Sequence, residues 1–110
     1  MPLNPYKLMW ALVFFDLPTL TAENRRDYRL FVRYLEKHGF NRMQYSVYVR
    51  FCGSMEKVES TIRRVQRKLP AEGQVSIAMF TDKQFSRIKN FYCRVERAKN
   101  PQPQQLLLFE

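Results

Sequence analysis

The sequence has few of the residues that build most metal and redox sites. Among its 110 residues are two cysteines, Cys52 and Cys93, and one histidine, His38. The cysteines form no CxxC pair and lie near no histidine cluster, so we expect free thiols and no zinc site. His38 falls at the expected C-terminal end of a helix, where the helix dipole favours a positive charge, and we assign it no catalytic role.

Long apolar runs are also lacking. No run approaches the roughly 18–20 residues that a membrane-spanning helix needs. The first apolar run is short and ends at an acid, Asp16, rather than at the small-residue cleavage site of a signal peptide. We therefore expect a cytoplasmic protein without a membrane partner.

Acidic residues are scarce relative to basic ones. The chain has 10 acidic and 19 basic residues and a net charge of +9. Such an excess favours a polyanionic partner, nucleic acid first and an anionic membrane surface second. The length indicates one domain with a thin core, so part of the apolar surface is expected to be shared with a second subunit.

The stretch MWALVFFDLPTLTAENRRDY, residues 9–28, carries the strongest functional signal. Its apolar residues 9–15 predict a central strand buried on both faces, which Pro18 prevents from continuing. Thr21 is a good N-cap for a helix that extends to about His38. Between strand and helix lies Asp16, either as an acid in a wet turn or as the candidate catalytic residue and metal ligand.

A single carboxylate per chain is too little to hold Mg²⁺ tightly. Two copies of Asp16 brought together across a dimer axis, with water and phosphate completing the coordination, would hold one Mg²⁺ per dimer. Such an ion could activate water to attack a phosphodiester.

The predicted helix is basic along one side and apolar along another. Its apolar stripe is Tyr28, Phe31, Val32 and Leu35. The candidate nucleic-acid-binding residues are Arg25, Arg26, Arg29, Arg33 and Lys37. These basic residues either form a solvated face or contact phosphates, whose oxygens suit the forked guanidinium of arginine.

The rest of the chain alternates between strand and helix patterns. Residues 40–51 predict a strand, continuous or bent into two, with Met43, Tyr45, Val47, Val49 and Phe51 on its buried face. Ser54 opens a second helix to about Leu69, and residues 74–81 predict another strand. Residues 85–99 fit either a helix or a strand. Tyr45 and Tyr48 could stack on bases, pack across strands or line a dimer interface.

This order of elements predicts an α+β fold, a ferredoxin-like βαββαβ sandwich with two helices on one face of an antiparallel sheet. We assign residues 1–92 to this domain and residues 93–110 to a C-terminal extension. The uncovered sheet face, expected to carry Tyr48, predicts a homodimer. The apolar residues 106–109 either remain disordered or dock on a sheet edge, in particular that of a partner subunit.

Three separated segments, FFDLPTLTAENRRDYRLFVRYLEKHGF, QYSVYVR and VSIAMFTDKQF, resemble the CRISPR-associated protein 2 family, most closely members from type II systems. The resemblance covers roughly residues 9–92. It implies a ferredoxin-like homodimer whose C-terminal strand crosses to the other subunit. It also implies Asp16 as metal ligand and Arg25, Arg26 and Arg29 as phosphate contacts.

For function, the resemblance implies a CRISPR adaptation protein that bridges two dimers of the CRISPR integrase and supports double-stranded prespacer DNA. Some family members are metal-dependent endonucleases on RNA or DNA. The residue-level interpretation and the resemblance agree on a basic nucleic-acid protein, and both leave open whether Asp16 is used in chemistry. By resemblance, residues 106–109 could also dock the integrase. The alternatives are a toxin-like metal-dependent ribonuclease of the same fold and a generic RNA binder.

Overall fold

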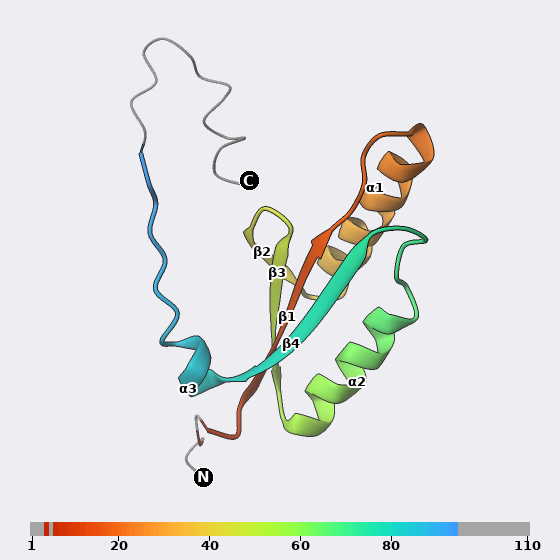
Figure 1. The fold of residues 1–110 in the computed structure, drawn as a ribbon. Helices are drawn as coiled ribbons and strands as arrows, with labels where there is room; N and C mark the ends of the chain where they lie inside the picture. Colours follow the sequence, from red (N-terminus) through yellow and green to blue (C-terminus); the bar gives the residue numbers. More distant parts are fainter. Residues whose placement is uncertain (1–3, 5, 95–110) are drawn as a thin grey trace.

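Four antiparallel strands form one sheet, and two long helices pack on one of its faces (Figure 1). The computed structural model describes residue 4 and residues 6–94. The elements are β1 (Met9–Asp16), α1 (Ala22–Lys37), β2 (Asn41–Gln44), β3 (Val47–Gly53), α2 (Met55–Gln66), β4 (Gln74–Thr81) and α3 (Asp82–Phe85). The strand order is β2-β3-β1-β4, so each long helix connects two strands that are separated by a third. This is the predicted ferredoxin-like α+β fold.

Both long helices begin at the predicted capping residues. The Thr21 hydroxyl accepts the N–H of Asn24 at 3.0 Å, and the Asn24 side chain accepts the N–H of Thr21 at 3.3 Å. Ser54 caps α2 in the same way through Lys57 N–H at 3.1 Å. These bonds satisfy amide groups that the first helical turn leaves without partners, which fixes where each helix starts.

The core lies between the sheet and the two helices. The odd-numbered residues of β1 point into it, and Val13, Leu35, Val58 and Val65 are its largest fully buried side chains. The opposite face of β1 carries Phe14, which is 42% exposed. The prediction that β1 is buried on both faces is therefore wrong for the single chain, because no second layer covers the sheet.

The predicted strand over residues 40–51 is a hairpin of β2 and β3 that turns at Tyr45 and Ser46. The turn and a register shift between Arg42 and Gln44 change the predicted alternation of side chains, although Val49 is buried as predicted. Tyr48 is 5% exposed and packs in the core, whereas Phe51 is 47% exposed on the open face. Tyr48 therefore does not lie on the uncovered face, contrary to the prediction.

The short helix α3 is attached to the start of β1. The indole N–H of Trp10 donates to Asp82 Oδ1 at 2.7 Å, and the Trp10 ring stacks on Phe85 with centroids 4.0 Å apart. Residues 86–94 then run away from the sheet without a further helix or strand (Figure 1). The other residues of the 85–99 segment and the apolar residues 106–109 lie outside the described residues. In the described part of the chain, no helix has both the length and the apolar character needed to span a membrane.

Candidate nucleic-acid and metal site

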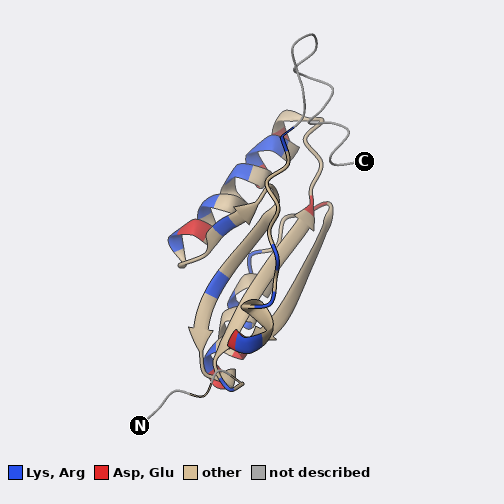
Figure 2. Cartoon of the chain, turned by 90° about the vertical axis from the view of Figure 1, so that its left-hand side faces the viewer, with Lys and Arg blue, Asp and Glu red and all other residues tan. Residues whose placement is uncertain are grey.

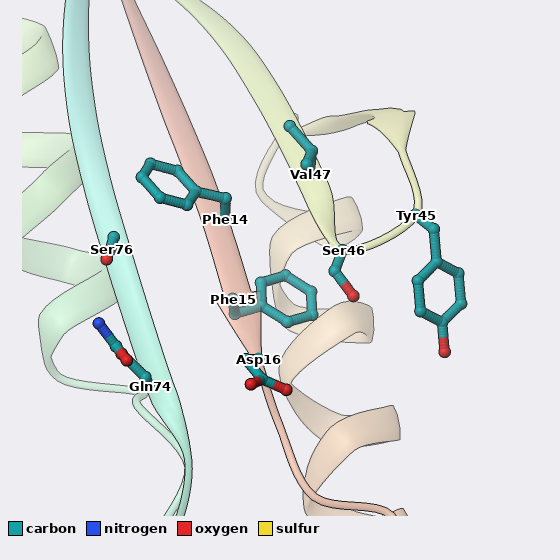
Figure 3. Close-up of a pocket in the computed structure, with 8 residues that line it drawn as sticks. All are labelled: Phe14, Phe15, Asp16, Tyr45, Ser46, Val47, Gln74 and Ser76. Carbon is teal, nitrogen blue, oxygen red and sulfur yellow. The ribbon is translucent and has the colours of Figure 1, made fainter. Parts of the chain in front are cut away.

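Asp16 is the last residue of β1, and its carboxylate lies at the open face of the sheet. There it lines a hollow of about 500 Å³ where the ends of β1 and β4 meet the β2–β3 turn (Figure 3). The hollow is lined by Phe14, Phe15, Asp16, Tyr45, Ser46, Val47, Gln74 and Ser76. The paired strands position these groups, since Asp16 lies opposite Gln74 and Phe14 lies between Val47 and Ser76.

The backbone at Asp16 is held by a close approach of Gly73. Gly73 has a φ of +101°, and a Cβ at this position would lie 2.8 Å from the Asp16 carbonyl oxygen and 2.8 Å from Leu17 Cδ2. Only glycine fits this contact without strain. The sequence alone did not predict this role of Gly73 in fixing the end of β1.

The polar groups of the hollow are oxygen-rich and suit a hard cation. The carboxylate of Asp16, the hydroxyl of Ser46 and the side-chain amide of Gln74 all line it, and Mg²⁺ prefers oxygen ligands and retains several waters. Among the described residues, no group of three or more His, Cys, Asp or Glu could hold a metal ion. One chain therefore places a single carboxylate in the hollow, beside two neutral side chains that carry oxygen.

All five predicted phosphate-binding residues are exposed on α1 (Figure 2). Arg25, Arg29, Arg33 and Lys37 recur at every fourth position, and with Arg26 they form one stripe along the helix. We call these five residues the α1 basic stripe. Among the described residues that line the Asp16 hollow, none belongs to it. The structure therefore places the basic residues and the carboxylate on different surfaces.

Arg25 also has a structural role that the sequence did not reveal. Its guanidinium donates from Nη1 to the carbonyl oxygens of Thr19 and Leu20, at 3.1 Å each. These bonds brace the loop between Asp16 and α1. The other members of the α1 basic stripe are therefore the better probes of phosphate binding.

Tyr45 and Tyr48 occupy different environments. A hydrogen bond with the Tyr28 hydroxyl raises the pKa of Tyr45, and the Arg42 guanidinium lies 5.6 Å from the centre of the Tyr45 ring. Burial raises the pKa of Tyr48, whose ring stacks on Phe15 with centroids 5.9 Å apart. Tyr48 therefore packs in the core and has no face free for a base, whereas Tyr45 borders the hollow.

Comparison with known proteins gives one consistent result. The model of the family described as CRISPR associated protein Cas2 matches residues 9–88. A protein of Flavobacterium psychrophilum, described as a CRISPR-associated endoribonuclease Cas2, is 40% identical over 107 residues, which cover 97% of this chain and 93% of that protein. Proteins with the same description from Paracidovorax avenae and Parvibaculum lavamentivorans are each 42% identical, covering 97% and 92% of this chain and 99% and 100% of their own lengths.

Proposed function

The chain belongs to the CRISPR associated protein Cas2 family, and we propose that it works in spacer acquisition as a homodimeric, DNA-binding scaffold that bridges integrase dimers. The observation that carries this proposal is the separation of the α1 basic stripe from the Asp16 hollow. A helix with exposed arginines at every fourth position can follow a phosphate backbone without placing that backbone at the carboxylate.

The open face of the sheet supports the homodimer. Leu12 lies on this face between Val49 and Ala78 of the neighbouring strands, and the exposed rings of Phe14 and Phe51 extend the apolar surface. Although Val49 is only 8% exposed, the exposed rings of Phe14 and Phe51 on one face of the sheet form an apolar surface of the kind that marks an interaction site. The sequence of β1 predicts burial on both faces, but one face is exposed in the single chain. A second copy of the chain that covers this face would bury it.

A metal-dependent endonuclease activity is the second candidate function. It is favoured by the endoribonuclease description of the relatives and by the oxygen-lined hollow around Asp16. Two Asp16 carboxylates in a dimer would hold Mg²⁺, which when bound supplies an activated water and neutralises phosphate charge. Ser46 and Gln74 line the same hollow as Asp16. The CRISPR association in the relatives' descriptions disfavours the toxin-like ribonuclease.

Two sets of substitutions distinguish the two functions. Arg26→Gln, Arg29→Gln and Arg33→Gln together should abolish spacer acquisition and weaken duplex DNA binding. For each phosphate that the variant no longer neutralises, the slope of log affinity against log salt should fall by about 0.9. Asp16→Ala should leave acquisition and duplex binding unchanged.

Arg63→Gln with Arg64→Gln, which removes two exposed charges on α2 where the α1 variant removes three, is the control for charge loss. If the arginine variant of α1 binds DNA with the wild-type salt slope, the proposal that the α1 basic stripe is the DNA-binding surface is wrong. Loss of acquisition in Asp16→Ala, with the dimer and its integrase complex intact, would instead place metal chemistry at the centre of the function.

A further inference from the structure

Ser46 has an unusual backbone conformation beside the Asp16 hollow. Its φ is +63°, and within the described part of the chain every other residue with positive φ is a glycine. Turns that need this conformation normally use Gly or Asn, which adopt it at lower cost. A residue held in a costly conformation next to a candidate site is a pointer to function.

The surrounding structure holds Ser46 in place from two elements. The Ser46 carbonyl oxygen accepts the N–H of Phe15, the residue before Asp16, at 3.1 Å. The neighbouring Tyr45 is tied to α1 by its hydrogen bond with Tyr28 and lies next to the Arg42 guanidinium. The backbone of the turn is therefore fixed relative to the end of β1, which defines where the Cβ of Ser46 lies.

The Ser46 hydroxyl is available for a ligand. It lines the same hollow as Asp16, and Figure 3 shows the two side chains at the same end of that hollow. Within the described part of the chain, the Ser46 hydroxyl makes no hydrogen bond, although the Ser46 carbonyl does. The serine thus keeps both a strained backbone and an unused donor at this position.

The chemistry of the hollow calls for neutral hydrogen-bond donors. A phosphodiester is anionic and accepts hydrogen bonds, whereas the Asp16 carboxylate is acceptor-only and repels it. Because none of the described lining residues of one chain is Lys or Arg, the groups that this chain offers to a phosphate beside Asp16 are neutral donors. The Ser46 hydroxyl is such a donor, and the hydrogen-bonded turn holds its backbone beside the hollow.

We propose that Ser46 is a substrate-binding residue of this hollow, whose hydroxyl donates a hydrogen bond to a non-bridging phosphate oxygen and orients the phosphodiester beside Asp16. This rests on the proposed endonuclease function and extends it by one residue. It is independent of the scaffold surface on α1.

The test uses Ser46→Gly and Ser46→Ala in the full-length protein. Glycine removes the hydroxyl and relieves the backbone strain, so the unfolding midpoint should stay the same or rise. Alanine removes the hydroxyl and keeps the strain. The probes are a short single-stranded RNA and the DNA strand of the same sequence, each with phosphorothioate linkages to prevent cleavage and with Ca²⁺ as the cation.

Both variants should bind the preferred strand roughly ten- to a hundred-fold more weakly, the effect of losing a hydrogen bond to a charged group. The salt slope should stay unchanged, because a neutral donor releases no counterion. Weaker binding by the alanine variant alone would mean that loss of the hydroxyl is not the cause, because the glycine variant lacks the hydroxyl too, and would overturn the proposal. Wild-type affinity in the glycine variant would also overturn it. So would a changed salt slope when the Ser46 substitutions are added to the Arg26→Gln, Arg29→Gln and Arg33→Gln variant and lower its affinity by the same factor.

Asp16→Asn separates this proposal from the function on which it rests. If Asp16→Asn abolishes Mg²⁺-dependent cleavage while Ser46→Gly binds and cleaves as the wild type does, the endonuclease function stands and the role of Ser46 is wrong. If Asp16→Asn changes neither binding nor cleavage, the hollow is not the nuclease site, and both fail together.

Discussion

Gly73→Ala tests whether a close backbone approach fixes the position of Asp16. At φ +101°, the left-handed conformation costs any L-residue roughly 1–2 kcal/mol. The new Cβ would also lie 2.8 Å from the Asp16 carbonyl oxygen and from Leu17 Cδ2, and forced overlap in a packed site costs roughly 1–3 kcal/mol. We therefore expect Gly73→Ala to lower the free energy of unfolding by about 2–5 kcal/mol.

Gly53 provides a matched control for this substitution. Its φ is +91°, close to that of Gly73, but a Cβ there would meet no atom within 4 Å. Gly53→Ala should therefore carry only the conformational cost of roughly 1–2 kcal/mol. The difference between the two variants isolates the contact with the end of β1.

Urea unfolding at one fixed protein concentration measures both values, because the stability of an associating protein depends on concentration. Gly73→Ala should also reduce any Asp16-dependent cleavage more than Gly53→Ala does, since its strain is relieved by moving the Asp16 backbone. Equal destabilisation by the two variants would refute the reasoning. It would mean that the loop before β4 moves aside without disturbing Asp16.

Three further predictions concern stability. Because burial raises the pKa of Tyr48 above its ordinary value of 10.0, the folded state favours the neutral phenol. The stability that this preference contributes is complete below pH 10 and is lost as the pH rises through the higher pKa of the folded state. The free energy of unfolding should therefore fall less with rising pH in Tyr48→Phe than in the wild type. Asp82→Ala removes the acceptor of the Trp10 indole and should shift tryptophan fluorescence and cost about 1 kcal/mol. Asp82→Asn keeps an acceptor and should change both the fluorescence and the stability less. Equal effects of the two substitutions would contradict the role of Asp82 as the acceptor of the indole. Leu35→Ala in the fully buried core should lower the free energy of unfolding by about 2–5 kcal/mol. Leu30→Ala on the same helix, at a side chain that is 47% exposed, should lower it by less than about 1 kcal/mol. Similar losses for the two variants in denaturant unfolding would refute the assignment of the core.

Local chemistry explains most of the successful predictions of secondary structure. Thr21 and Ser54 cap the two long helices as predicted, and β4 has the predicted bounds. These features depend on hydrogen bonds and side-chain periodicity within a few residues, which the sequence displays directly. The hairpin turn was harder to locate, because Tyr45 and Ser46 are not the Gly or Asn that mark tight turns.

The candidate site was only partly predictable for the same reason. Asp16 stood out because it ends an apolar run, and the basic residues of α1 stood out by their spacing. Gln74 and Gly73 carried no local signal and Ser46 stood out only as part of the segment QYSVYVR, because the contacts of these residues form where distant segments meet. The sequence did not reveal that the basic residues of α1 and the carboxylate occupy different surfaces.

The sequence by itself determined the order of strands and helices, the positive charge and, through its spaced motifs, the family. These properties follow from composition and from interactions between near neighbours in the chain. Only the tertiary structure decided which face of each strand is buried and which polar groups surround Asp16. A one-residue shift in strand register reverses every side chain, and that register is set by pairing between segments that are far apart in the sequence.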